Sequence, residues 1–340
     1  MSRTPVPNLM QLSPFTDFCF LFLSIVLEGA PFILLGTVIS GIIDAYLPPG
    51  LIDRWLPKNK PLAVILSALL GAIFPVCECT IVPVIRRLIK KGLPISCAVT
   101  YMLSAPIINP ITVISTMNAF QSSTKNFSLR ENPTTIETYS AAFMTSSRLF
   151  IAFLVTVSVG MILLRVRKKT ILAQSLVDDD AVKDGHEHTD HEHGEDHEHS
   201  HDHTVDEPKT NRPVLAMRTA MRDFIETGMY FTIGVAITAV FKAFVTEDLV
   251  MVFNQSEPVG VGLMMMLAFI LSLCSTSDAF IAANFPVPQS ARLAFLVYGP
   301  MMDVKLIFMY LTVFRKKFVL VLAVSLFFAI GILSYVWFKI

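Results

Sequence analysis

The stretch LAVILSALLGAIFPVCECTIVPVIRRLI, residues 62–89, decides the fold of this chain. It is long and apolar enough to enter a membrane, since a spanning helix needs about 20 mainly apolar residues. Pro75 and Pro83 flank a Cys-Glu-Cys run at 77–79 in its middle. Proline interrupts a helix, and an interrupted helix survives in a bilayer only where it faces protein or a water-filled cavity. The stretch therefore predicts a helical membrane protein with a break inside it.

The composition extends this interpretation to the whole chain. Of the 340 residues, 53% are hydrophobic and only 16% are charged, with a mean hydropathy of +0.60, whereas a soluble domain has about a quarter of its residues charged. The net charge of zero gives no attraction to nucleic acid. The first apolar run is too long for a secretory signal. We expect an all-α polytopic bundle of about eight spans with broken or proline-kinked helices, at 15–47, 62–89, 95–117, 139–164, 224–245, 261–285, 291–314 and 318–338.

Two halves of the chain repeat one another. The first and second repeated features lie 49 residues apart in one half (28 to 77) and 48 in the other (226 to 274). Duplicated halves are the usual plan of secondary transporters, although a duplicated scaffold without transport is the alternative. We predict transmembrane repeats at 1–164 and 214–340 around a loop at 165–213, and four spans per half imply parallel repeats. The repeated features are Glu28 and Glu226, the Cys-containing runs 77–80 and 274–277, and the runs 106–109 and 300–303.

Basic residues near span ends predict the orientation. A basic run at 165–169 follows the fourth span, which puts the central loop in the cytoplasm. Counting back four spans puts the N-terminus there too. The run 315–317 would then fall outside, against the rule. We expect a multi-pass protein of the inner cell membrane, in contact with lipid.

Polar residues inside the spans are the candidate transport site. Thiolates suit soft ions such as Cu(I) and zinc, and ionisable side chains at membrane depth usually mark ion paths. The competing interpretation is that Cys fills space and that Ser and Thr bond to neighbouring helices. Cys19 and Cys97 are expected to be core residues, and Asp303 and Lys305 are too close along one helix to face each other. The candidate path residues are Glu28, Cys77, Glu78, Cys79, Thr80, Asn109, Glu226, Cys274, Ser275, Thr276, Ser277, Asp278 and Asp303.

The central loop contains all eight histidines of the chain, within 186–203, among many carboxylates. Such an acidic, low-complexity segment is expected to be disordered when free. Dense His with interleaved Asp and Glu is typical of metal binding, and imidazole suits zinc, copper and nickel. The alternative is a solvated charged linker. The predicted loop ligands are His186, His188, His191, His193, His197, His199, His201 and His203.

Outside this loop, nearly all of the chain resembles a bacterial family of predicted permeases that includes organoarsenical efflux permeases and a branch linked to copper and zinc efflux. The resemblance rests on the Cys-Glu-Cys-Thr-Ile-Val-Pro run at 77–83, the Ser-Ala-Pro turn at 104–106 into Asn109-Pro110, and the run 274–279. It implies that Cys77, Cys79 and Cys274 are the thiols that meet the transported metal or metalloid ion. The His-rich loop favours the copper and zinc branch, because trivalent arsenicals prefer thiols.

The leading hypothesis is a permease, not an enzyme, that exports a soft metal or metalloid ion without a cofactor. No Gly-rich run ends in the Gly-Lys-Ser/Thr of a nucleotide-binding loop, so an ion gradient or an accessory subunit is expected to drive it. An organoarsenical permease is the alternative cargo class. A thiol-redox protein using Cys77 and Cys79, or a metal sensor, would be another kind of protein. The sequence leaves open a homo-oligomer or an accessory metal-delivery protein.

Overall fold

The computed structural model describes residues 14–48, 51–52, 56–73, 76–128, 141–166, 171–172, 212–244, 257–285 and 287–339. The elements in these ranges are helices, and five of them are long and apolar enough to cross a membrane. The predicted all-α membrane bundle is thereby confirmed. The histidines at 186–203, the predicted metal ligands of the loop, lie outside the described residues.

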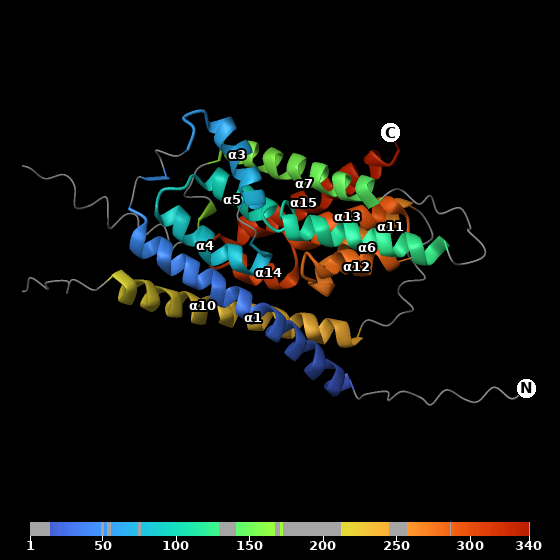
Figure 1. Ribbon diagram of the computed structural model, residues 1–340, viewed down its shortest axis with the longest axis horizontal. Helices are drawn as coiled ribbons and strands as arrows, with labels where there is room; N and C mark the ends of the chain where they lie inside the picture. Colours follow the sequence, from blue (N-terminus) through green and yellow to red (C-terminus); the bar gives the residue numbers. More distant parts are fainter. Residues whose placement is uncertain are drawn as a thin grey trace, which may run out of the picture.

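Each half contains the same succession of helices (Figure 1). In the first half these are α1 (Pro14–Tyr46), α3 (Lys60–Ile73), α4 (Glu78–Lys90), α5 (Ile95–Ser104), α6 (Pro110–Ser128) and α7 (Ala141–Leu163). In the second half they are α10 (Arg212–Phe244), α11 (Glu257–Leu271), α12 (Ser277–Asn284), α13 (Gln289–Met301), α14 (Val304–Tyr310) and α15 (Lys316–Trp337).

Helices α3 and α4 form a hairpin that enters the bundle and returns to the same end. The end of α3 lies in the middle of the bundle, because Gly71 faces Ala105 just after α5. Helix α4 then runs beside α1 in the same direction: Lys91, after α4, donates to the carbonyl of Asp44 near the end of α1 (2.8 Å). Figure 1 shows α3, α4 and α5 gathered at this end. The stretch 62–89 is therefore a re-entrant hairpin and not a span.

Helices α5 and α6 form one interrupted crossing. Asn109 ends the break by accepting a hydrogen bond from the backbone N–H of Ile111 (2.9 Å), an N-cap that satisfies a free donor at the start of α6. The second half has the same plan: α11 and α12 form a hairpin from the opposite end, and α13 and α14 form an interrupted crossing (Figure 1). Two of the eight predicted spans, 62–89 and 261–285, therefore do not cross.

The two halves run in opposite directions. Helices α1 and α10 pack antiparallel, since Gly29 faces Phe231 whereas Gly41, further along α1, faces Ala216 near the start of α10. At Gly41 a side chain would collide with the backbone of Ala216, so glycine lets the two helices approach closely there. In the described residues each half crosses three times, because its hairpin returns to the end from which it entered. After an odd number of crossings the second half begins at the opposite end and is therefore inverted. The expectation of parallel repeats is therefore wrong.

Helix α7 ends and α10 begins at one end of the bundle, which we call the loop-side end; α1 begins at the opposite, far end (Figure 1). The expectation that the N-terminus and the central loop share one side is therefore wrong for the described chain. The run 315–317 now joins the other basic residues, because Arg315 donates to the carbonyls of Ile171 and Leu172 just after α7. The charge conflict found in the sequence disappears.

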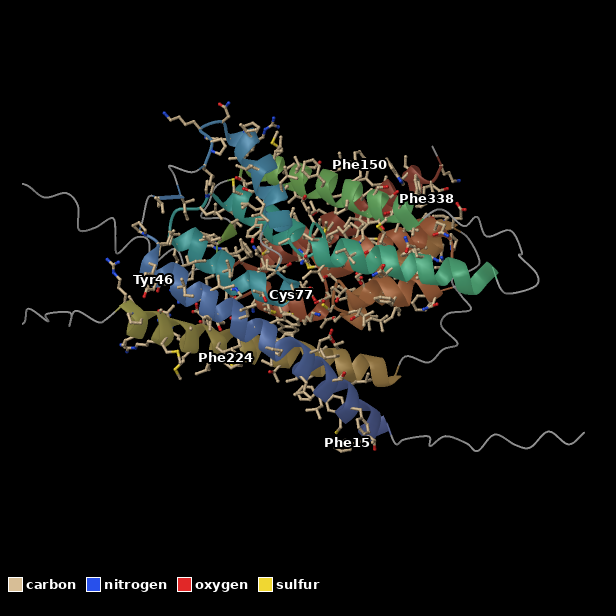
Figure 2. All side chains as sticks on the ribbon, in the orientation of Figure 1. Phe15, Tyr46, Cys77, Phe150, Phe224 and Phe338 are labelled. Carbon is tan, nitrogen blue, oxygen red and sulfur yellow. The ribbon has the colours of Figure 1, made fainter. Side chains whose placement is uncertain are left out.

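The outer surface of the bundle is apolar. Figure 2 shows Phe15, Tyr46 and Phe150 pointing outward and Cys77 lying in the middle, and the side chain of Phe15 is 74% exposed. Large exposed apolar patches mark a surface that something else covers, and lipid is the partner expected for a bundle of apolar helices. The charged residues Glu78, Arg148, Asp278, Asp303 and Lys305 lie inside, whereas Glu28 on α1 is exposed.

Candidate functional site

The tips of the two hairpins meet in the middle of the bundle and share one hydrogen-bond pattern. The carbonyl of Cys77 accepts from the N–H groups three and four residues later, and the carbonyl of Cys274 does the same. This places the two cysteines at equivalent positions. In the first tip Cys77 is extended and begins α4. In the second, Ser272 has a φ of 47° and ends α11, a backbone conformation uncommon for residues other than glycine.

A cavity of about 50 Å³ lies between these tips and helix α1. It is large enough for a small ion or a water molecule. Three thiols line it, those of Cys77, Cys79 and Cys274. Its other polar lining residues are Glu28, Glu78, Ser272, Ser277 and Lys305. Both halves of the chain thus contribute soft and charged groups to one cavity.

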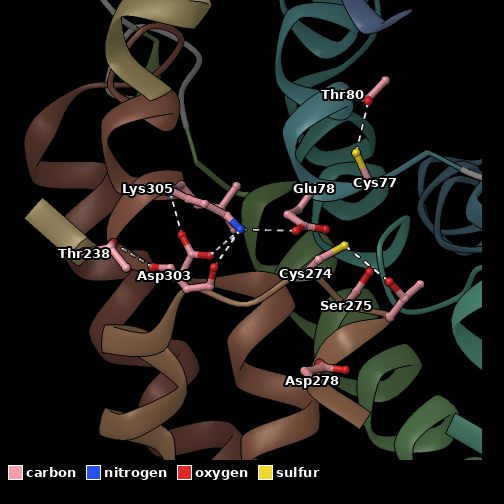
Figure 3. A network of polar contacts seen from close by, with 12 residues as sticks. Cys77, Glu78, Thr80, Thr238, Cys274, Ser275, Asp278, Asp303 and Lys305 are labelled. Carbon is pink, nitrogen blue, oxygen red and sulfur yellow. Dashed lines mark hydrogen bonds and ion pairs between the residues drawn. The ribbon is translucent and has the colours of Figure 1, made fainter. Parts of the chain in front are cut away.

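Lys305 is the charged centre of the site (Figure 3). Its ammonium lies 3.4 Å from Glu78 Oε1 and 3.5 Å from Asp303 Oδ2, and it donates to the carbonyl of Ser272 at 3.0 Å. Glu78, Asp303 and Lys305 are all at most 3% exposed. One buried ammonium therefore serves two buried carboxylates, and Glu78 Oε2 has no hydrogen-bond partner.

The expectation that Asp303 and Lys305 do not face each other is wrong. Asp303 stands before α14 with an extended backbone and caps it, accepting from the N–H of Leu306 (2.7 Å). Its carboxylate therefore points back over the first turn, where Lys305 lies. Lys305 was not predicted as a site residue, although an ionisable side chain in an apolar span is itself a signal.

A second buried ion pair holds the other hairpin. Arg148 on α7 lies 2.8 Å from Asp278 on α12, and it also donates to Thr116 (2.7 Å) and to the carbonyl of Ser275 (3.3 Å). Each hairpin tip is thus bound by a cation from the opposite half: Glu78 by Lys305, and Asp278 by Arg148. Neither Arg148 nor Asp278 lines the cavity.

The remaining hydroxyl and amide candidates stabilise the breaks. Thr80 donates to the carbonyl of Phe32 (2.8 Å) and lies 3.1 Å from the Cys77 sulfur. Ser275 Oγ lies 3.5 Å from Thr112 Oγ1, and Thr276 Oγ1 lies 3.5 Å from the Cys274 sulfur. These contacts, like the cap made by Asn109, satisfy polar groups that hydrocarbon would leave unpaired.

Two predicted residues lie elsewhere. Glu226 on α10 pairs with Arg86 on α4 (2.6 Å) and does not line the cavity, unlike its repeat counterpart Glu28. Cys19 is exposed on α1, against the expectation of a core position, whereas Cys97 is buried as expected. Among the described residues there is no group of three or more His, Cys, Asp or Glu arranged to hold a metal ion. The three thiols share a cavity without forming a closed ligand set.

Comparisons with known proteins agree over almost the full length. A family model described as a predicted permease matches residues 15–338. The UPF0718 protein YcgR of Bacillus subtilis is 36% identical over 313 residues, covering 91% of this chain and 93% of that protein. A protein of Streptococcus mutans named as a putative two-component membrane permease complex subunit is 33% identical over 302 residues, covering 88% of each. No solved structure matches.

Proposed function

This chain belongs to the predicted permease family, and we propose that it exports a soft metal or metalloid ion through the cavity between its two halves. A permease is a membrane transporter rather than an enzyme, so the family lends no support to a thiol-redox role. In this proposal 1–164 and 214–340 are the transport repeats, and 165–213 is the loop that joins them.

The observation that carries the proposal is the shared lining of one cavity by three thiols. Cys77 and Cys79 come from the first hairpin and Cys274 from the second. Thiolates bind soft ions strongly. Carriers built from inverted repeats hold their substrate at the repeat interface and move one repeat against the other. Such a movement would change how many thiols reach the ion, which allows both capture and release.

The cargo we favour is copper or zinc. Imidazole binds both metals, and the sequence of the central loop is rich in histidine. The basic helix ends at the loop-side end support a cytoplasmic position for that loop in the inner membrane. Its histidines would then collect metal before export. An organoarsenical needs only the thiols and is the second cargo class.

A partner subunit is part of the proposal. The Streptococcus mutans relative is named as a subunit of a two-component permease complex. By analogy, a second membrane protein or a metal-delivery protein would work with this chain. Transport that needs the partner would show as low activity of the purified chain, recovered on adding the partner.

Transport into proteoliposomes tests the proposal, with Cu(I), Zn²⁺ and methylarsenite compared. The double variant Cys77→Ser, Cys79→Ser removes two of the three cavity thiols and is expected to lower transport at least about tenfold, the usual effect of changing a metal site's ligand environment. Cys97→Ser is the matched control, because Cys97 lies on α5 outside this cavity. If the double variant transports as well as the control, the thiol site is wrong.

A further inference from the structure

A second buried charge cluster lies between α1, α4 and α10. Arg87 on α4 donates through Nε and a terminal nitrogen to both carboxylate oxygens of Asp223 on α10 (3.0 and 2.7 Å). Ser40 on α1 also donates to Asp223 (2.7 Å). Asp223 is 1% exposed. A two-pronged guanidinium–carboxylate pair of this kind is among the strongest polar contacts in proteins.

Asp44 extends the cluster to its outer edge. Its carboxylate lies 3.4 Å from Arg87 and accepts a hydrogen bond from Thr219 (3.2 Å). Its backbone carbonyl accepts a hydrogen bond from Lys91 (2.8 Å). Three helices are therefore tied together by one network. We call it the ionic lock, and it consists of Ser40, Asp44, Arg87, Lys91, Thr219 and Asp223.

The ionic lock lies between the cavity and the loop-side end. On α1, Phe32 lines the cavity, and Ser40 and Asp44 follow about 12 and 18 Å further along at 1.5 Å per residue. On α4, Cys79 lines the cavity and Arg87 follows about 12 Å later. An ion that left the cavity along α1 and α4 toward the loop-side end would meet the lock.

Among the residues that the structure describes, the repeat relation finds no such lock on the opposite side. If Glu28 is matched with Glu226, Asp223 corresponds to Ile25; if Cys77 is matched with Cys274, Arg87 corresponds to Asn284. Ile25 is apolar and itself lines the cavity. Asn284 donates only within its own helix, to Phe280. The Arg87–Asp223 pair on the loop side is thus replaced on the far side by Asn284 and Ile25, which cannot form an ion pair.

We infer that the ionic lock is the closed loop-side gate of the transport path, and that the cavity is reached from the far side in this state. The inference rests on the proposed function only in assuming that the chain transports something. In carriers of inverted repeats the two halves exchange conformations between states, so the lock must open when the cavity turns to the loop side. Arg87 and Asp223 then control access, without touching the cargo.

Thiol labelling tests this without any cargo. Cys77 is kept as the single cysteine, the other four are changed to Ser, and a membrane-impermeant maleimide is added from one face of sealed vesicles at a time. The double variant Arg87→Gln, Asp223→Asn removes both charges and leaves none unpaired. We expect labelling from the loop-side face to rise about tenfold, as a two-state population shift would produce, while labelling from the far face stays level or falls.

Two further variants keep the test decisive. Arg87→Lys retains the charge but loses the two-pronged geometry, and it should raise loop-side labelling by a smaller factor even if the double variant folds poorly. Arg315→Gln, at the same end but outside the lock, should leave labelling unchanged. Equal labelling in all variants, or an equal rise from both faces, would overturn the gate. Because labelling needs no metal, its outcome is independent of whether the cargo is correctly assigned.

Discussion

The two hairpin tips occupy equivalent places in the inverted halves, yet their ion pairs differ in kind. Asp278 pairs at 2.8 Å with an Arg148 that has two further acceptors, away from the cavity. Glu78 pairs at a looser 3.4 Å with Lys305, beside three thiols and inside the cavity lining. The comparison indicates that one pair holds the fold, whereas the other is available to respond to an ion.

The largest effect should come from breaking the tighter pair. Arg148→Ala leaves the buried carboxylate of Asp278 without its cation, and an uncompensated buried charge costs about 3–5 kcal/mol. We expect the free energy of unfolding to fall by that amount. The change is measured by equilibrium unfolding of the purified protein in detergent.

The matched double variant Arg148→Met, Asp278→Leu supplies the control. Replacing both partners by apolar groups of similar size is often neutral, so most of the lost stability should return. If it does not return, Arg148 acts through its contacts with Thr116 and the Ser275 carbonyl rather than through the ion pair. If Arg148→Ala is as stable as the parent, the structural role assigned to this pair is incorrect.

The looser pair should affect transport more than stability. Glu78→Gln keeps the size of the side chain, and Lys305 retains Asp303 and the carbonyl of Ser272. Removing one negative charge beside a passing cation weakens its attraction by about 1 to 4 kcal/mol at about 4 Å, so we expect the apparent affinity for metal to fall about tenfold. Initial transport rates against metal concentration measure it.

Glu257→Gln is the matched carboxylate control, since Glu257 begins α11 at the far end, outside the cavity lining. Its transport should equal that of the parent. A Glu78→Gln variant that transports normally but unfolds at lower denaturant would make the two hairpin pairs alike, and the distinction drawn between them would be lost.

Local features of the fold could be predicted from the sequence because they depend on nearby residues. The helical class follows from apolar composition, and the first break follows from Pro75 and Pro83. The second hairpin turns at 272–276 without a proline, and the caps made by Asn109 and Asp303 were not predicted. Whether 62–89 crosses the membrane or turns back could not be predicted. An apolar segment of this length satisfies its backbone hydrogen bonds equally well as a crossing or as a hairpin. That one ambiguity, repeated at 261–285, produced the wrong topology.

The site was predictable as a set of residue types and not as an arrangement. The thiols of Cys77 and Cys274 are separated by almost 200 residues, and only packing of the two halves brings them to one cavity. Glu28 and Glu226 looked equivalent by spacing, but a nearby Arg86 binds Glu226. Lys305 pairs with Asp303 because α14 begins just after Asp303. On one continuous helix, their spacing would have kept the two side chains apart.

The smallest effect should come from the caps at the two interrupted crossings. Asn109→Ala removes the acceptor for the N–H of Ile111, and loss of a cap costs about 1 kcal/mol. Asp303→Asn keeps an acceptor for Leu306 but removes a charge beside Lys305. Unfolding and transport are measured on both variants. We expect Asn109→Ala to lower stability slightly with normal transport, and Asp303→Asn to change transport more than stability. The opposite pattern would mean that the first crossing, rather than the second, responds to the ion, although only Asp303 carries a charge beside Lys305.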